Sequence, residues 1–106
     1  MKKTLAAVIA ALAMQAPPAH AITVVGTPSC GTWVAERAKN DWLNVKNIAW
    51  LVGYLTGMAV ATDVDALKNT DNESLYLWMD NWCRGNPLKN VSEGGVELFK
   101  ELAKRR

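Results

Sequence analysis

The sequence has little of what enzymes use for catalysis. It contains one histidine and two cysteines in 106 residues, and the histidine, His20, precedes the predicted end of an N-terminal signal. Without it the chain has no Ser-His or Cys-His dyad and no His-ligated metal site. There is no Gly-x-Ser-x-Gly motif, and no spacing pairs the acids that could perform general acid-base catalysis, which are Asp63, Asp65, Asp80 and Glu93. We therefore expect a non-enzymatic protein without a cofactor or metal.

A secretory signal is predicted at the N-terminus. Lys2 and Lys3 precede an apolar run over residues 5–14, and Ala19-His20-Ala21 supplies small residues at the two positions that a signal peptidase reads. Cleavage after Ala21 would leave residues 22–106 as a single helical domain in the periplasm or the medium. An uncleaved N-terminal anchor is the alternative, but it needs a longer apolar run.

Neither sign of charge dominates after the signal is removed. Two of the twelve Lys and Arg residues, Lys2 and Lys3, lie in the signal, so ten basic and ten acidic residues remain and the formal net charge is zero. Nucleic acid is therefore not an expected partner. Asp63 and Asp65 have no third ligand nearby, so we expect a solvated turn there and not a cation site.

The two cysteines, Cys30 and Cys83, predict a disulfide. A single pair in a small secreted domain is usually structural, and a loop of about 54 residues closed in this way contributes roughly 4 kcal/mol in the chain-entropy model. A redox-active pair is the alternative, but it favours Cys-x-x-Cys spacing or a neighbouring cation.

No segment alternates with period two for long enough to form a sheet, so the expected fold is all-α with four short helices. Thr27-Pro28 predicts the cap of a first helix that ends near Lys39. The connection Asn40 to Lys46 follows, with Asn44 or Asn47 capping the next helix. Thr70 to Glu73 resembles a capping box before a third helix that stops at Gly85. Asn86-Pro87 opens the last helix, whose apolar side includes Leu88, although its regular part could start at Ser92.

The expected centre of the bundle is the uncharged stretch Ile48 to Ala61, which has no polar face. A helix that is apolar all round is buried or spans a membrane, and this one is too short to span. Small residues recur every four positions in this stretch, at Ala49, Gly53, Gly57 and Ala61. They predict close contact with another helix, so a Gly57→Leu change should unfold the domain.

Three residues are candidates for contact with a partner. Leu77 points away from the apolar face of its helix, and Trp42 lies in the predicted connection. Arg37 falls on the apolar side of the first helix. Its guanidinium extends past the helix end while its methylene groups pack. Alternatively, it pairs with a carboxylate or stacks on Trp33, and could then bind an acidic group of a partner. Five tryptophans in so small a domain fit either a core of large side chains or a wide aromatic binding surface.

Three features together resemble the HdeA-like superfamily of small periplasmic helical proteins, which includes HdeA-type acid chaperones and Tai-type amidase immunity proteins. They are the early Cys30, the Gly-Tyr-Leu-x-Gly stretch from Gly53 to Gly57, and Cys83 followed by Asn-Pro. The resemblance implies a four-helix, disulfide-tied bundle around a central apolar helix, with other proteins or a second copy as partners. The chain lacks the additional cysteines of many Tai-type proteins.

Two binding functions follow. The first is an inhibitor or immunity protein that occludes a partner, such as a secreted cell-wall hydrolase, through an exposed apolar patch with a polar rim. The second is an acid-activated chaperone that holds unfolded clients, because protonation of ten carboxylates leaves about ten positive charges that could open the bundle.

Overall fold

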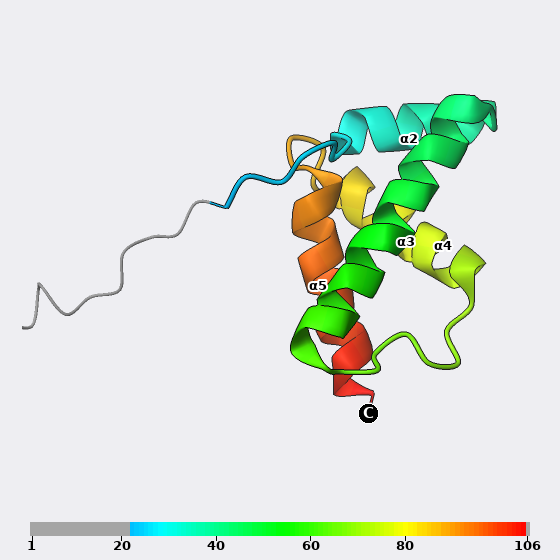
Figure 1. Cartoon of the computed structure of the whole chain (residues 1–106). Coiled ribbons are helices and arrows are strands. Elements are labelled where there is room, and N and C mark those ends of the chain that lie inside the picture. The colour runs from blue at the N-terminus through cyan, green and yellow to red at the C-terminus, as the bar shows by residue number, and fades with distance from the viewer. Residues whose placement is uncertain (1–21, 106) are drawn as a thin grey trace, which may run out of the picture.

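Residues 22–105 are described by the structure, a computed structural model, and they form four helices (Figure 1). The helices are α2 (Cys30–Lys39), α3 (Trp42–Thr62), α4 (Asn72–Gly85) and α5 (Val91–Lys104). In this part of the chain the only β pairing is an isolated bridge between Ser29 and Asn90, so the all-α prediction is confirmed. The predicted signal peptide, with His20, lies outside the described residues. None of the helices in residues 22–105 is long and apolar enough to cross a membrane.

Local capping sets where each helix begins. The side chains of Ser29, Asp41 and Asp71 accept hydrogen bonds from backbone N–H groups in the first turns of α2, α3 and α4. At the start of α5, Glu93 Oε2 accepts from the backbone N–H of Asn90 at 3.1 Å, the return half of a capping box.

The cap positions correct several predictions. Ser29 and not Thr27 caps α2. Residues 42–46, predicted as a connection, form the first turn of α3, because Asp41 caps a helix there. Asn44 and Asn47, predicted caps, are buried inside this helix. Leu88, predicted inside the last helix, precedes its Asn90 cap.

The helices cross so that α2 and α5 each pack against both α3 and α4. A disulfide between Cys30 and Cys83 joins the first turn of α2 to the last turn of α4, as predicted. The largest fully buried side chains come from all four helices: Trp33, Leu51, Leu55, Met79 and Val91. The core therefore lies where the four helices meet, and α3 covers it from one side only (Figure 1).

The prediction that α3 is buried all round is wrong. Its buried side chains belong to one side, namely Asn44, Asn47, Leu51 and Leu55. Ala49, Gly53, Gly57 and Ala61 are all exposed, and a Cβ atom added at Gly53 or Gly57 would meet no atom within 4 Å. The stripe of small residues therefore faces away from the core. We call this surface the outer face of α3; it comprises Trp42, Lys46, Ala49, Gly53, Gly57 and Val60.

The glycines that do allow close helix contact are in α5. A Cβ added at Gly94 would lie 2.6 Å from Cε3 of Trp82 and 2.8 Å from Sδ of Met79, both on α4. A Cβ at Gly95 would lie 2.9 Å from Cδ2 of Tyr54 on α3. These distances are shorter than van der Waals contact. The two glycines therefore let α5 approach α3 and α4 closely.

A matched pair of substitutions tests this assignment. We expect Gly94→Ala to lower the free energy of unfolding by about 1–3 kcal/mol, because the methyl group overpacks the contact with Trp82 and Met79. Gly57→Ala should instead raise it by up to about 1 kcal/mol, since alanine favours the helix and the site is open. Urea denaturation of both variants in dilute solution measures the difference. Equal losses of stability would contradict the assignment.

Candidate binding loop at the disulfide

Residues 86–90 connect α4 to α5 and form a short arch beside the start of α2 (Figure 1). We call this segment the 86–90 loop. It begins three residues after Cys83, and the Cys30–Cys83 disulfide holds α2 and α4 together at its base, with both cysteines buried. The loop is therefore attached to the most strongly crosslinked point of the fold.

Backbone hydrogen bonds hold the loop at both ends. At the first end the backbone N–H of Asn86 donates to the carbonyl oxygen of Cys83 at 3.1 Å, and Nδ2 of Asn86 donates to that of Trp82 at 2.9 Å. At the second end the N–H of Cys30 donates to the carbonyl oxygen of Lys89 at 2.9 Å. The N–H of Lys89 closes the turn on Asn86 at 3.1 Å. These bonds attach the loop to the end of α4 and to the start of α2.

Side chains of α4 also support the 86–90 loop. The Nζ atom of Lys89 lies 5.9 Å from the centre of the Trp82 ring, a cation–π contact. Trp82 in turn stacks on Trp78, with their ring centres 6.4 Å apart. The half-buried tryptophans of α4 therefore form a platform under Lys89, next to the close contact with Gly94.

The tip of the loop is apolar and fully open to solvent. Leu88 is 99% exposed, the largest value among the exposed large hydrophobic residues of the described part, and Pro87 before it is also exposed. A single exposed leucine is common on flexible surfaces. Here the side chain lies at the tip of a loop whose two ends are held by hydrogen bonds.

An apolar groove runs beside the loop. It lies between α2 and α4 and has a volume of about 340 Å³. Its lining residues are Cys30, Gly31, Val34, Ala35, Cys83, Arg84 and Pro87. Arg84 is its one charged residue. Its guanidinium donates to Oδ1 of Asn81 at 3.3 Å, and within residues 22–105 no carboxylate pairs with it. The loop and groove together offer a leucine, an apolar surface and a free cation.

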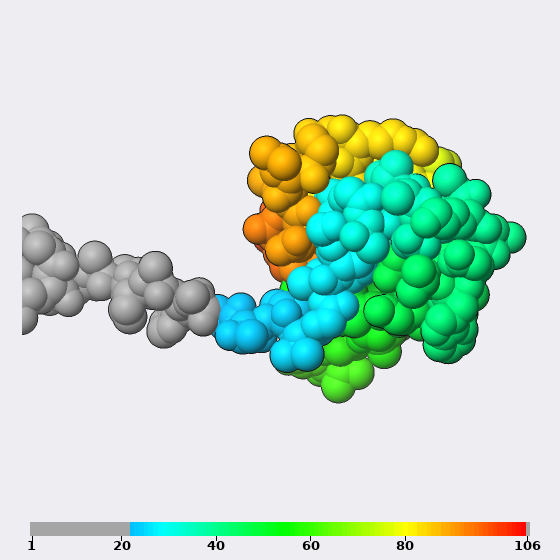
Figure 2. Space-filling model, turned by 90° about the horizontal axis from the view of Figure 1, so that it is seen from above, coloured from blue at the N-terminus to red at the C-terminus, as the bar shows by residue number. Residues whose placement is uncertain are grey.

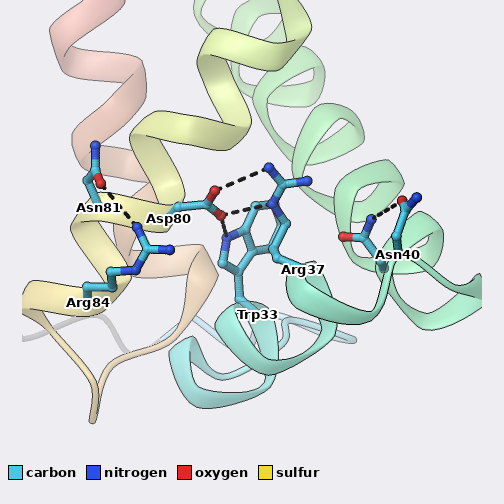
Figure 3. Close-up of polar contacts among 7 residues, drawn as sticks. Trp33, Arg37, Asn40, Asp80, Asn81 and Arg84 are labelled. Carbon is cyan, nitrogen blue, oxygen red and sulfur yellow. Dashed lines mark hydrogen bonds and ion pairs between the residues drawn. The ribbon is translucent and has the colours of Figure 1, made fainter.

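Arg37, by contrast, is occupied inside the fold. Its Nε donates to Oδ1 of Asp80 at 2.9 Å and one terminal nitrogen donates to Oδ2 at 3.2 Å. The same Oδ1 accepts from Nε1 of the fully buried Trp33 at 2.7 Å. Figure 3 shows both donors converging on Asp80, while Arg84 lies on the other side of it.

These contacts decide between the predicted environments of Arg37. The guanidinium lies 5.6 Å from the centre of the Tyr76 ring, so the aromatic partner is Tyr76 and not Trp33. The hydrogen bond to Asp80 raises the pKa of Arg37 above its ordinary value, and the negative charge of Asp80 acts in the same direction against desolvation. Arg37 thus stays charged and joins α2 to α4 through Asp80.

The other two predicted contact residues are exposed but separate. Leu77, 57% exposed, lies on α4, and Trp42, 73% exposed, lies at the first residue of α3. Neither lines the groove beside the 86–90 loop. Sequence reasoning missed Leu88 because Asn86-Pro87 resembles the start of a helix, which placed the leucine on a buried side. The Asn90–Glu93 capping pair was the signal that places it outside.

Among residues 22–105 no three acidic, cysteine or histidine side chains come close enough together to hold a metal ion. Asp63 and Asp65 lie at the end of α3 beside an open hollow. Comparison with models of protein families, with curated proteins and with solved structures gives no match to this chain.

Proposed function

We propose that the protein is a secreted binding module of the inhibitor type, which occludes an apolar cleft of another protein with its 86–90 loop. The observation that carries the proposal is the fully exposed Leu88 at the tip of a loop held at both ends by hydrogen bonds. Binding surfaces concentrate their energy in a few anchors that enter pockets on the partner.

The fixed backbone supports this mechanism. A loop that is ordered before binding loses less conformational entropy in the complex than a flexible one. The disulfide at the base of the loop also holds together α2 and α4, the two helices on which the loop rests. Small domains that inhibit enzymes benefit from this arrangement, because the loop can enter a cleft without rearranging.

The neighbouring groove and cations define the expected partner. The apolar wall formed by Val34, Ala35 and Pro87 extends the contact beyond one leucine. Arg84 and Lys89, both exposed, form a basic rim that favours an acidic surface around the partner's cleft. A secreted enzyme such as a cell-wall hydrolase is the concrete form of partner that we propose, since a disulfide-tied domain belongs to an oxidising compartment.

Site-specific crosslinking tests the proposal. A photoreactive amino acid at position 88, with the same residue at position 77 as a matched exposed leucine site, is used in the periplasm or culture medium of the producing cell. We expect position 88 and not position 77 to capture a distinct protein, which mass spectrometry identifies.

Affinity for that purified partner is then measured with two variants. Leu88→Asp should weaken binding by roughly 30-fold or more, which is about 2 kcal/mol, while its unfolding free energy stays within about 0.5 kcal/mol of the parent. Leu77→Asp should leave affinity unchanged. Normal binding by Leu88→Asp, or capture through position 77 alone, would reject the loop as the binding site.

A further inference from the structure

The outer face of α3 is the second unusual surface of the molecule. Over 21 residues the helix carries one charged side chain, Lys46, and its exposed face is otherwise apolar or small. Trp42 and Val60, 73% and 77% exposed, lie near its two ends, and Gly53 and Gly57 lie between them. Figures 1 and 2 place this helix and the 86–90 loop on different sides of the molecule. The two surfaces can therefore be occupied independently.

The two ends of the outer face are complementary in shape. At the first end Trp42 projects into solvent. Beside the last turns, next to Val60, an open hollow of about 440 Å³ lies between α3 and the following turn, with Ala59, Val64 and Leu67 in its wall. One end thus projects a large aromatic ring, and the other end has an apolar space next to the face.

The two ends are also complementary in charge. Lys46 is exposed in the second turn of α3, and within residues 22–105 no acid forms an ion pair with it. Asp63, which ends the helix, and Asp65 are exposed at the opposite end, beside the hollow. Lys46 and Asp63 are about 25 Å apart along the helix at 1.5 Å per residue, so they cannot pair within one chain.

We propose that the outer face of α3 binds the same face of a second copy of this chain, with the two helices antiparallel. The point midway between positions 46 and 63 lies between Gly53 and Gly57, slightly past the centre of α3. An antiparallel pair that crosses there places each Lys46 opposite the partner's Asp63 and directs each Trp42 to the partner's hollow. The small central residues let the two backbones approach closely, as glycine pairs do in other helix contacts.

A second copy in the antiparallel orientation satisfies both ends at once, whereas a parallel one does not. A twofold interface requires that each contact occurs twice, with the two residues exchanged between the copies. A parallel pair would place Lys46 beside Lys46 and Trp42 beside Trp42, with both hollows unfilled. Antiparallel helices also align opposite ends of their dipoles. Each α3 is only about 31 Å long, so we expect a reversible dimer that is weaker than an obligate one.

Sedimentation equilibrium of the purified chain, with a matched pair of variants, tests self-association. We expect a reversible dimer, and Gly53→Glu should raise its dissociation constant at least about tenfold, since two like charges would meet near the twofold axis. Gly85→Glu makes the same change at another exposed helical glycine and should leave the constant unchanged. Circular dichroism should show that both variants keep their helices.

The register is tested on the unaltered protein with a zero-length carbodiimide crosslinker followed by mass spectrometry. We expect an amide bond between Lys46 of one copy and Asp63 or Asp65 of the other, and loss of this bond in Gly53→Glu. A monomer at every concentration, a dimer that Gly53→Glu does not weaken, or a bismaleimide crosslink between two Lys46→Cys chains would overturn the proposal. Binding of the monomer to phospholipid vesicles in place of dimer formation would also overturn it.

Discussion

Removal of the Cys30–Cys83 disulfide is expected to lower the free energy of unfolding by about 4 kcal/mol. The bond closes a loop with a sequence separation of 53 residues, and in the chain-entropy model a loop of this length restricts the unfolded chain by about that amount. The expected loss is a large fraction of the total stability of so small a domain. Both sulfur atoms are also buried against the core, so their loss leaves space as well.

The measurement compares urea denaturation of the parent with that of a Cys30→Ala, Cys83→Ala double variant, each with and without a thiol reductant. The parent should lose stability on reduction, and the double variant should be insensitive to the reductant. Because the 86–90 loop starts three residues after Cys83, reduction should also weaken partner binding under conditions where the fold persists. A loss below about 1 kcal/mol would show that helix packing alone sets the stability.

Asp80→Ala should cost about 3 kcal/mol, the next largest effect. The change leaves the Arg37 guanidinium without its carboxylate and the buried Trp33 indole N–H without its acceptor. Removing one partner of a largely buried ion pair typically costs about 3–5 kcal/mol. Because the Arg37 side chain is 25% exposed, we expect a loss at the lower end of this range. Thermal and urea denaturation measure the loss.

A double-mutant cycle separates the ion pair from its surroundings. Arg37→Ala and Asp80→Ala should couple by at least about 1 kcal/mol. Glu97→Ala is the control, because it removes an exposed pair with Lys100 at 3.5 Å, which is worth less than about 1 kcal/mol. If Asp80→Ala cost no more than this control, the network would not hold α2 to α4.

The fold class and the disulfide could be predicted because their signals are local or unique. Apolar periodicity over residues 74–83 and the stop near Gly85 depend on near neighbours in the sequence, and two cysteines allow one pairing only. The start of α3 could not be placed in the same way. Asp41 caps a turn in which Trp42 and Leu43 are exposed, so the apolar pattern there did not mark a helix.

The sequence could not predict whether the small-residue stripe faces the core or the solvent, and the reason is physical. In α3 both sides are apolar, so periodicity does not distinguish the covered side from the open one. Glycine in a helix is also ambiguous: Gly94 permits close packing, whereas Gly57 borders solvent. The Asp80 network joins residues 43 and 47 positions apart, and nothing in either segment alone indicates the other.

The two proposed surfaces make separable predictions. Gly53→Glu should weaken self-association at least about tenfold and keep affinity for the partner, because the 86–90 loop lies on a different side of the molecule. Leu88→Asp should weaken binding to the partner and leave self-association unchanged. A variant that loses both activities without unfolding would indicate that dimer formation is needed to complete the partner site.

The position of the disulfide also orders the maturation of the chain. Cys30 is in the first described helix and Cys83 in the last turn of the third. If the chain is exported from its N-terminus, as the proposed secretion requires, it presents Cys30 long before Cys83 appears. During that interval the Cys30 thiol has no correct partner, and the one incorrect product available to it is a disulfide with another molecule. Oxidation too early should therefore give crosslinked chains, whereas a finished chain has a single pairing and no disulfides to reshuffle.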